Sequence, residues 1–158
     1  LLENPRGFAA QITAVGSNLD ECLPDAEGID DVAAVPGRIV DVKGRATVPA
    51  PPEFGVSQFV ATVLLAARRQ GSHARAALNI AYDEETIEAL RAREHVAAAF
   101  DPAAEFDEDG LDAAIADALA SEPDAAVLYH EGAYGIEPNV YVLGPDAATV
   151  AKRVRAIL

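Results

Sequence analysis

Residues 56–81 (VSQFVATVLLAARRQGSHARAALNIA) decide the fold of this chain. The apolar side chains of the first half recur at helical spacing: Phe59, Val60, Val63, Leu64 and Ala67. This periodicity predicts an amphipathic helix over Val56–Arg69. The apolar run Ala76–Ala81 then predicts a buried strand. A helix that leads into a buried strand is a typical unit of a layered α/β domain.

The alternation continues toward the C-terminus. Further strands are expected at Val96–Phe100, Ala125–Tyr129 and Asn139–Leu143. Further helices are expected from Asp83 to Arg93, from Leu111 to Ala120 and from Asp146 to Leu158, with the two aspartates as N-caps. The acidic stretch 101–110 reads as a loop. This order predicts one three-layer α/β domain over residues 1–158, with a mixed, largely parallel sheet flanked by helices.

The N-terminal third is less regular. Strands are expected at Gly7–Val15 and Arg38–Val42, with Arg45–Val48 as the hairpin partner of the second. A short helix is expected at Ile29–Ala34. These elements would make the sheet mixed.

The charge balance indicates the environment of the protein. There are 26 acidic against 12 basic residues, and Lys43 and Lys152 are the only lysines. A net charge of −14 destabilises a small domain by self-repulsion, which salt screens. We therefore expect a protein of a halophilic archaeon, with an ordinary acidic protein as the alternative. Such a surface would not bind nucleic acid by itself, because binding needs Lys and Arg on phosphates.

Cys22 is the only cysteine, so no disulfide within the chain and no cysteine-based metal site is expected. No stretch has the length of a membrane span, and no signal sequence opens the chain, so we expect a cytoplasmic protein. The chain has no methionine. Leu1 is therefore not a native start, and we expect a further domain upstream.

Several loops carry residues suited to an anionic ligand, which in open α/β sheets binds beyond the carboxyl ends of strands. Gly16, Ser17 and Asn18 offer backbone amides and polar side chains, and Arg38 follows a Pro-Gly turn. Ser57 lies at the start of the strong helix, where unpaired amides bind anions. Each has a plainer alternative: a turn, a surface ion pair and an N-cap.

Two more segments are candidates. Asn79 lies at the end of a strand and could present its amide to a ligand. His130, Glu131 and Gly132 leave a buried strand and combine a titratable ring, a carboxylate and a flexible glycine. Adjacent His and Glu do not have metal-ligand spacing on a helix, so no metal site is expected.

Taken in order, these segments resemble the ThiN family of thiamine-phosphate synthase domains over nearly the whole chain. The resemblance rests on Val15–Asn18, Pro36–Val40, Glu53–Gly55 with Ser57, Leu78–Ile80 before Tyr82, and the loop with Gly132, Gly135, Glu137 and Pro138. Catalytic members join a pyrimidine diphosphate to a thiazole phosphate. They release pyrophosphate and form thiamine monophosphate.

This chain departs from the synthase-type pattern in two loops. The resemblance implies an Arg-His pair after Ser57, where this chain has Gln58 and Phe59. A lysine is also implied before Glu137, where this chain has Ile136. Both departures remove positive charge, so we expect no catalytic residue and no enzyme activity. Phe59 could alternatively belong to the core.

The chain most resembles the ThiN-like ligand-binding domain of haloarchaeal thiamine-responsive helix-turn-helix transcription regulators. That resemblance implies an effector-sensing domain that binds thiamine mono- or diphosphate without catalysis, acts as a homodimer, and reaches DNA only through a missing N-terminal helix-turn-helix domain. The expected ligand-binding residues are Gly16, Ser17, Asn18, Arg38, Gly55, Ser57, Asn79, His130, Glu131, Gly132 and Glu137. The alternative is an active synthase domain, possibly from a fusion with a kinase, and in that case Mg²⁺ is a possible cofactor.

Overall fold

The computed structural model describes residues 7–103 and 108–158. Its strands are β1 (Leu19–Cys22), β2 (Val32–Ala34), β3 (Val40–Asp41), β4 (Ala46–Thr47), β5 (Glu53–Phe54), β6 (Ala76–Ala81), β7 (Ala97–Ala99), β8 (Val127–His130) and β9 (Asn139–Gly144). Its helices are α1 (Phe59–Arg69), α2 (Glu84–Arg91), α3 (Glu108–Ser121) and α4 (Ala147–Arg155), with short 3₁₀ turns η1 (Phe8–Gln11) and η2 (Ile29–Asp31). Residues 104–107 of the expected acidic loop lie outside the described ranges.

The main sheet has seven strands in the order β5-β2-β1-β6-β9-β8-β7. Within the described ranges β7 and β8 form the one parallel pair, and every other neighbouring pair is antiparallel. The prediction of a largely parallel sheet is therefore wrong. β8 and β9 are joined as a hairpin and are therefore antiparallel. β9 also lies next to β6 and is antiparallel to it.

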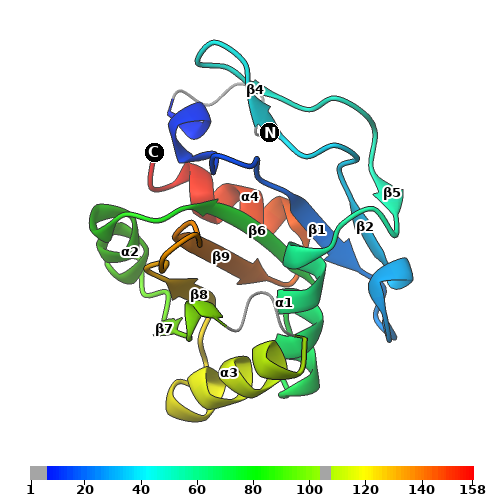
Figure 1. Cartoon of the computed structure of the whole chain (residues 1–158), viewed down its shortest axis with the longest axis vertical. Coiled ribbons are helices and arrows are strands. Elements are labelled where there is room, and N and C mark those ends of the chain that lie inside the picture. Colours follow the sequence, from blue (N-terminus) through cyan, green and yellow to red (C-terminus); the bar gives the residue numbers. More distant parts are fainter. Residues whose placement is uncertain (1–6, 104–107) are drawn as a thin grey trace.

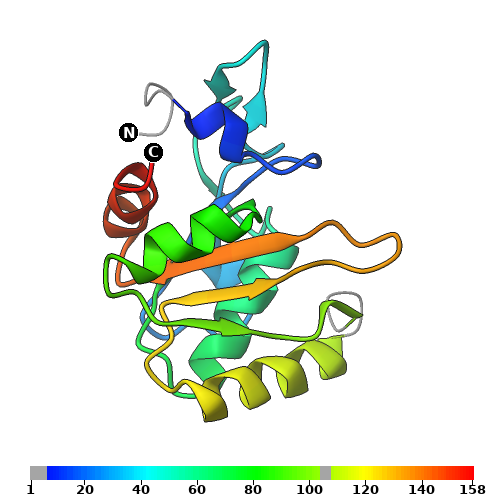
Figure 2. The ribbon, with the colours of Figure 1, turned by 90° about the vertical axis from the view of Figure 1, so that its left-hand side faces the viewer.

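The three-layer α/β arrangement is confirmed. One core cluster joins the sheet to α1 and α3, and a second joins it to α2 and α4. Strand β9 shows the alternation: Tyr141 and Leu143 face the first cluster, whereas Val140 and Val142 face the second. Figure 1 shows the sheet between these helices, and Figure 2 shows α3 and α2 on opposite sides of it.

The N-terminal third departs most from expectation. The strand expected at Gly7–Val15 is instead the 3₁₀ turn η1 followed by a loop, and the chain enters the sheet later, at β1. The helix expected at Ile29–Ala34 is the single turn η2, which leads into β2. Three short strands at one side of the sheet, β1, β2 and β5, have too few residues for a detectable alternation, so their pairing is decided by tertiary contacts.

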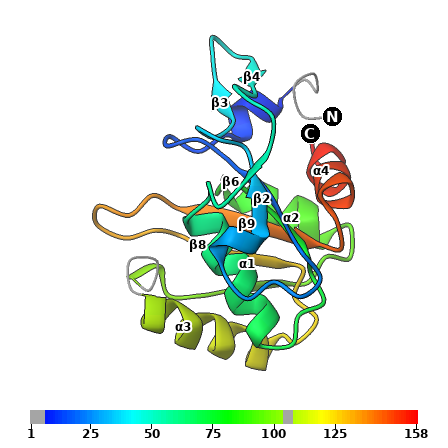
Figure 3. The same cartoon turned by 90° about the vertical axis from the view of Figure 1, so that its right-hand side faces the viewer.

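The remaining helices and strands are confirmed with changed bounds: α1, α2 and α4 are shorter than expected, β6 is as expected, and α3 and β9 are longer. α3 begins at Glu108, so the expected loop 101–110 is wrong over its last three residues. Asp83 and Asp146 accept hydrogen bonds from the backbone N–H groups of Thr86 and Thr149, at 2.6 and 2.7 Å, and so cap α2 and α4. β3 and β4 pair as the expected hairpin, which forms a separate two-stranded sheet that projects from the rest of the domain (Figure 3).

Candidate functional site

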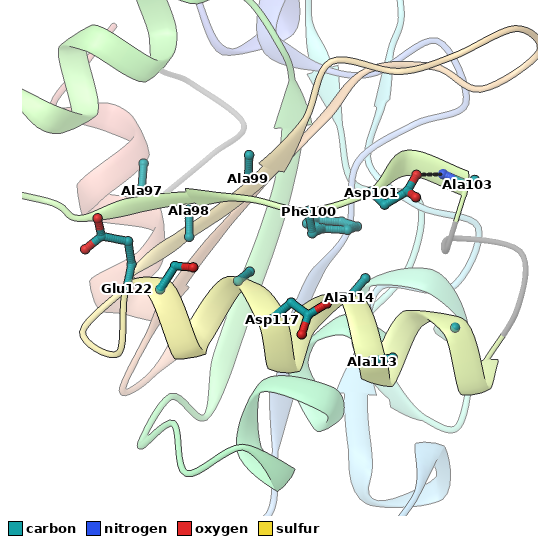
Figure 4. A pocket seen from close by; sticks show the side chains of 13 residues that line it. Ala97, Ala98, Ala99, Phe100, Asp101, Ala103, Ala113, Ala114, Asp117 and Glu122 are labelled. Atoms are coloured by element: carbon teal, nitrogen blue, oxygen red, sulfur yellow. Dashed lines mark hydrogen bonds between the residues drawn. The ribbon is translucent and has the colours of Figure 1, made fainter.

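A cavity of about 820 Å³ forms a groove between α3 and the edge strand β7 (Figure 4). Its lining is mainly alanine, together with the carboxylates of Asp101, Asp117 and Glu122. No described residue that lines it carries a positive charge, so a phosphorylated ligand would be repelled. A second groove, of about 630 Å³, is mostly apolar and lies beside α4. Neither groove contains a residue predicted for ligand binding.

A third cavity, of about 280 Å³, unites the predicted loops, and we take it as the candidate site. Its size is near the lower limit for small-molecule sites. Six of the predicted ligand-binding residues line it: Gly16, Asn18, Arg38, Ser57, Asn79 and Glu137. Gln58 and Phe59 line it as well.

Arg38 is held at the mouth by two neighbouring turns. Gly37 and Arg38 both have positive φ, 74° and 67°, and backbone bonds join Ser17 to Ile39 in both directions. The Arg38 guanidinium is exposed and donates to the Val15 carbonyl at 2.7 Å. Gly16 is required here, because a Cβ at this position would lie 3.0 Å from the Arg38 Cβ, and the Gly16 φ is +94°. The two turns therefore place a guanidinium beside the cavity.

Buried amide side chains form a polar network at the cavity. Asn79 Oδ1 accepts from the backbone N–H of Asn18 at 2.6 Å, and Asn79 Nδ2 donates to Asn139 Oδ1 at 3.4 Å. Asn139 in turn donates to the Tyr141 hydroxyl at 3.2 Å. The Asn18 side chain is bonded on both sides to the backbone of Val35, so its role is to hold this loop. Such a bonded network keeps the cavity wall rigid.

The N-terminus of α1 faces the cavity. Gln58 is the N-cap residue, and its side chain makes no cap hydrogen bond. The first amides of the helix carry partial positive charge, which attracts an anion. Phe59 is 40 % exposed and lines the cavity, so the alternative that it belongs to the core is excluded. Together with Val15 and Val56, which are also exposed, it gives the mouth an apolar wall.

The loop between β8 and β9 closes the other side. Glu137 accepts from the backbone N–H of Ala14 at 2.6 Å and so ties this loop to the segment before Gly16. Gly132 has a φ of +77°, and a Cβ there would lie 2.6 Å from the Ile136 carbonyl oxygen. Gly132 therefore shapes the loop and does not itself line the cavity.

Four other predicted residues do not reach the cavity. The His130 side chain is buried: its ring packs on Phe100 with 5.1 Å between centroids, and Nδ1 accepts from the Gly132 N–H. Glu131 accepts from the Tyr82 hydroxyl at 3.2 Å. Ser17 is buried, and Gly55, with a φ of +75°, forms the turn before Ser57.

Sequence reasoning missed a buried carboxyl group next to the site. Asp20 in β1 has no exposed surface, and neither of its oxygens has a hydrogen-bond partner among the described residues. Burial raises the pKa of Asp20 to about 7, and the adjacent Ser57 hydroxyl opposes this effect only in part. The Ser57 hydroxyl is thus near the carboxyl without being in good hydrogen-bond geometry. β1 has two adjacent acids, Asp20 and Glu21, and no local signal in the sequence marks Asp20 as the buried one.

Fold and site define an α/β domain with a small pocket, lined by Arg38 and the start of α1, that is built from loops at one end of a mixed sheet. The model of the family described as thiamine-phosphate synthase ThiN matches residues 1–156, and the chain belongs to this family.

Two relatives and one solved structure are similar to at least 92% of the chain. The thiamine-phosphate synthase ThiN of Methanothermobacter thermautotrophicus is 34% identical over 100% of this chain and 87% of its own length. The bifunctional thiamine biosynthesis protein ThiDN of Methanocaldococcus jannaschii is 36% identical over 92% of this chain, which spans 36% of that protein. The crystal structure of the C-terminal domain of a phosphomethylpyrimidine kinase superposes with a TM-score of 0.86 at 27% identity, covering 95% of this chain and 89% of that one.

These relatives correct one expectation. The prediction that this domain is not an enzyme is contradicted, because the family and its full-length relative are named for a synthase. Gln58 and Phe59 do line the cavity, but Arg38 and the start of α1 supply positive charge to it. The departure at two positions was too weak a basis for inferring loss of catalysis.

Two further observations concern the described residues. No helix in them is long and apolar enough to cross a membrane. No group of three or more His, Cys, Asp or Glu side chains in residues 7–103 and 108–158 is arranged to hold a metal ion.

Proposed function

We propose that this domain is a thiamine-phosphate synthase that binds its phosphorylated substrates in the Arg38 cavity. The observation that carries the proposal is the convergence of Arg38, the α1 N-terminus and an apolar wall on one cavity of about 280 Å³. The cationic side chain suits a phosphate group, and the apolar wall suits a heteroaromatic ring.

The chemistry needs stabilisation of a leaving anion. As the bond between pyrimidine and thiazole parts forms, the carbon–oxygen bond to the diphosphate breaks and pyrophosphate leaves. Arg38 and the first amides of α1 would stabilise the negative charge that develops on the leaving group. A Mg²⁺ ion brought with the diphosphate would neutralise further charge, and Glu137 offers a carboxylate oxygen for it at the cavity.

The test is direct. The chain is incubated with the pyrimidine diphosphate, the thiazole phosphate and Mg²⁺, and thiamine monophosphate is quantified by chromatography. Product is expected from the wild type and a strong loss from Arg38→Ala. Arg45→Ala is the matched control, because Arg45 is an exposed arginine of the β3–β4 hairpin that does not line the cavity. Absence of product, together with absence of heat when thiamine monophosphate is titrated in a calorimeter, would refute the proposal.

We also propose, as a second function, that ligand occupancy is communicated to an attached DNA-binding domain. The observation that favours this is the path of the first segment: Ala14 is bonded to Glu137, and the adjacent Gly16 lines the cavity. The helix-turn-helix domain, the DNA target, the homodimer and the cytoplasmic, halophilic setting remain predictions. Gel-shift titration of the full-length protein with thiamine phosphates tests this function, and an unchanged DNA affinity would contradict it.

A further inference from the structure

The buried carboxyl group of Asp20 lies directly behind the candidate site. β1 places Asp20 on the sheet face that packs against α1, two residues after Asn18 and opposite Ala77 of β6. Its side chain has no exposed surface, and both oxygens are without a hydrogen-bond partner among the described residues. An ionised carboxylate in such a place is strongly disfavoured, so the neutral acid is the form that the fold accommodates.

Ser57 connects this acid to the cavity. Its side chain is 6% exposed, lines the cavity, and lies next to the Asp20 carboxyl group. Ser57 also directly precedes the N-cap residue of α1, the helix whose start lines the cavity. A hydroxyl group has one proton to donate, so its orientation toward Asp20 or toward the cavity excludes the other.

Few charged side chains lie on the elements around Asp20 and Ser57. In the strands that flank Asp20, β2 and β6 contain no ionisable side chain. The charged groups on the elements around it are Arg68 and Arg69 at the opposite end of α1, Asp30 and Asp31 of η2, Glu53 of β5, and Glu21 on the other sheet face. Of the described residues that line the cavity, Arg38 and Glu137 are charged. None of these contributes to the raised pKa of Asp20, whose cause is burial.

We propose that Asp20 is a positioning residue for the ligand's phosphate. This rests on the proposed function, because it takes that phosphate to bind at the α1 N-terminus. The neutral carboxyl group donates to Ser57 Oγ, and the Ser57 O–H then points into the cavity and donates to a phosphate oxygen. When Asp20 is ionised, the Ser57 O–H turns back to the carboxylate. Oxygen lone pairs and a nearby negative charge then face the phosphate.

The pH range follows from burial. The pKa of Asp20 is raised to about 7. At pH 8 roughly one tenth of the free protein would carry the neutral acid, whereas at pH 6 almost all of it would. Since apparent affinity scales with the competent fraction, the dissociation constant is expected to rise about tenfold over this range.

The experiment is calorimetric titration of the 158-residue chain with thiamine monophosphate at pH 6 and pH 8, for wild type, Asp20→Asn and Ser57→Ala. The ligand's own phosphate titrates equally in all three. The rise in dissociation constant from pH 6 to pH 8 is expected to be about tenfold larger for wild type than for Asp20→Asn. Ser57→Ala is expected to lose most of this difference although it retains Asp20.

The outcomes separate the hypotheses. Binding with the same pH dependence in wild type and Asp20→Asn would overturn the role of Asp20 while leaving the proposed function intact. A pH dependence kept in full by Ser57→Ala would overturn the connection through the hydroxyl group. Absence of binding in every variant at both pH values, with folding verified by circular dichroism, would overturn the proposed function and this inference with it.

Discussion

Replacement of Asp20 by asparagine tests the buried acid through stability, independently of any ligand. The pKa of Asp20 is raised from 3.8 to about 7 on folding, because burial disfavours the charged form. The folded state therefore retains a proton that the unfolded state releases. The stability from this group is fully present below pH 4 and is lost as the pH rises to about 7. A change of about three pKa units corresponds to about 4 kcal/mol in total.

The window accessible to experiment is smaller. Between pH 5 and pH 8 the loss from Asp20 is about 2.5 kcal/mol, and Asp20→Asn removes this dependence. From pH 5 to pH 8 the free energy of unfolding of Asp20→Asn, measured relative to that of the wild type, should therefore rise by about 2.5 kcal/mol. The other titrating groups are the same in both proteins and cancel in this comparison. Urea denaturation followed by circular dichroism in constant 2 M KCl measures it, where about 2 M salt screens the surface charge.

Asp124→Asn is the control, because Asp124 is an exposed aspartate at the surface. Its difference from the wild type should not change over the same interval. A constant difference between Asp20→Asn and wild type from pH 5 to pH 8 would refute the reasoning, since it would mean that Asp20 is ionised in the folded state.

Three further predictions concern single contacts. Arg38→Ala should weaken binding of thiamine monophosphate about 10- to 100-fold, because a charged hydrogen bond is lost. Arg45→Ala should leave the affinity measured by calorimetry unchanged, and equal losses in the two variants would contradict phosphate binding by Arg38. Gly132→Ala should destabilise the domain by about 2 kcal/mol or more, and Gly135→Ala should destabilise it by less. Both glycines have positive φ, but only at Gly132 would an added Cβ collide with neighbouring atoms. Equal urea midpoints for the two variants would contradict this. Asp83→Ala should cost about 1 kcal/mol through loss of the α2 cap, and an unchanged thermal midpoint would count against it.

The candidate site was largely predictable because its residues lie in loops with recognisable chemistry. Arg38 after a glycine turn and Ser57 before a strong helix are local patterns, and both line the cavity. His130 has the same apparent chemistry, yet its ring packs in the core on Phe100. No local pattern distinguishes a histidine at a strand end that faces a ligand from one that faces the interior. Asp20 was missed for the same reason.

By itself, the sequence determined the elements whose signals are local. Helical periodicity predicted α1, an apolar run predicted β6 with its observed bounds, and Asp83 and Asp146 capped the helices that follow them. Only the tertiary structure decided which strands are neighbours. β9 pairs with β6, from Ala81 with Asn139 to Ala76 with Gly144. This long-range pairing is antiparallel, where alternation of helices and strands predicted a parallel sheet. The burial that raises the pKa of Asp20 likewise comes from α1 packing over β1, a contact that no short stretch of sequence contains.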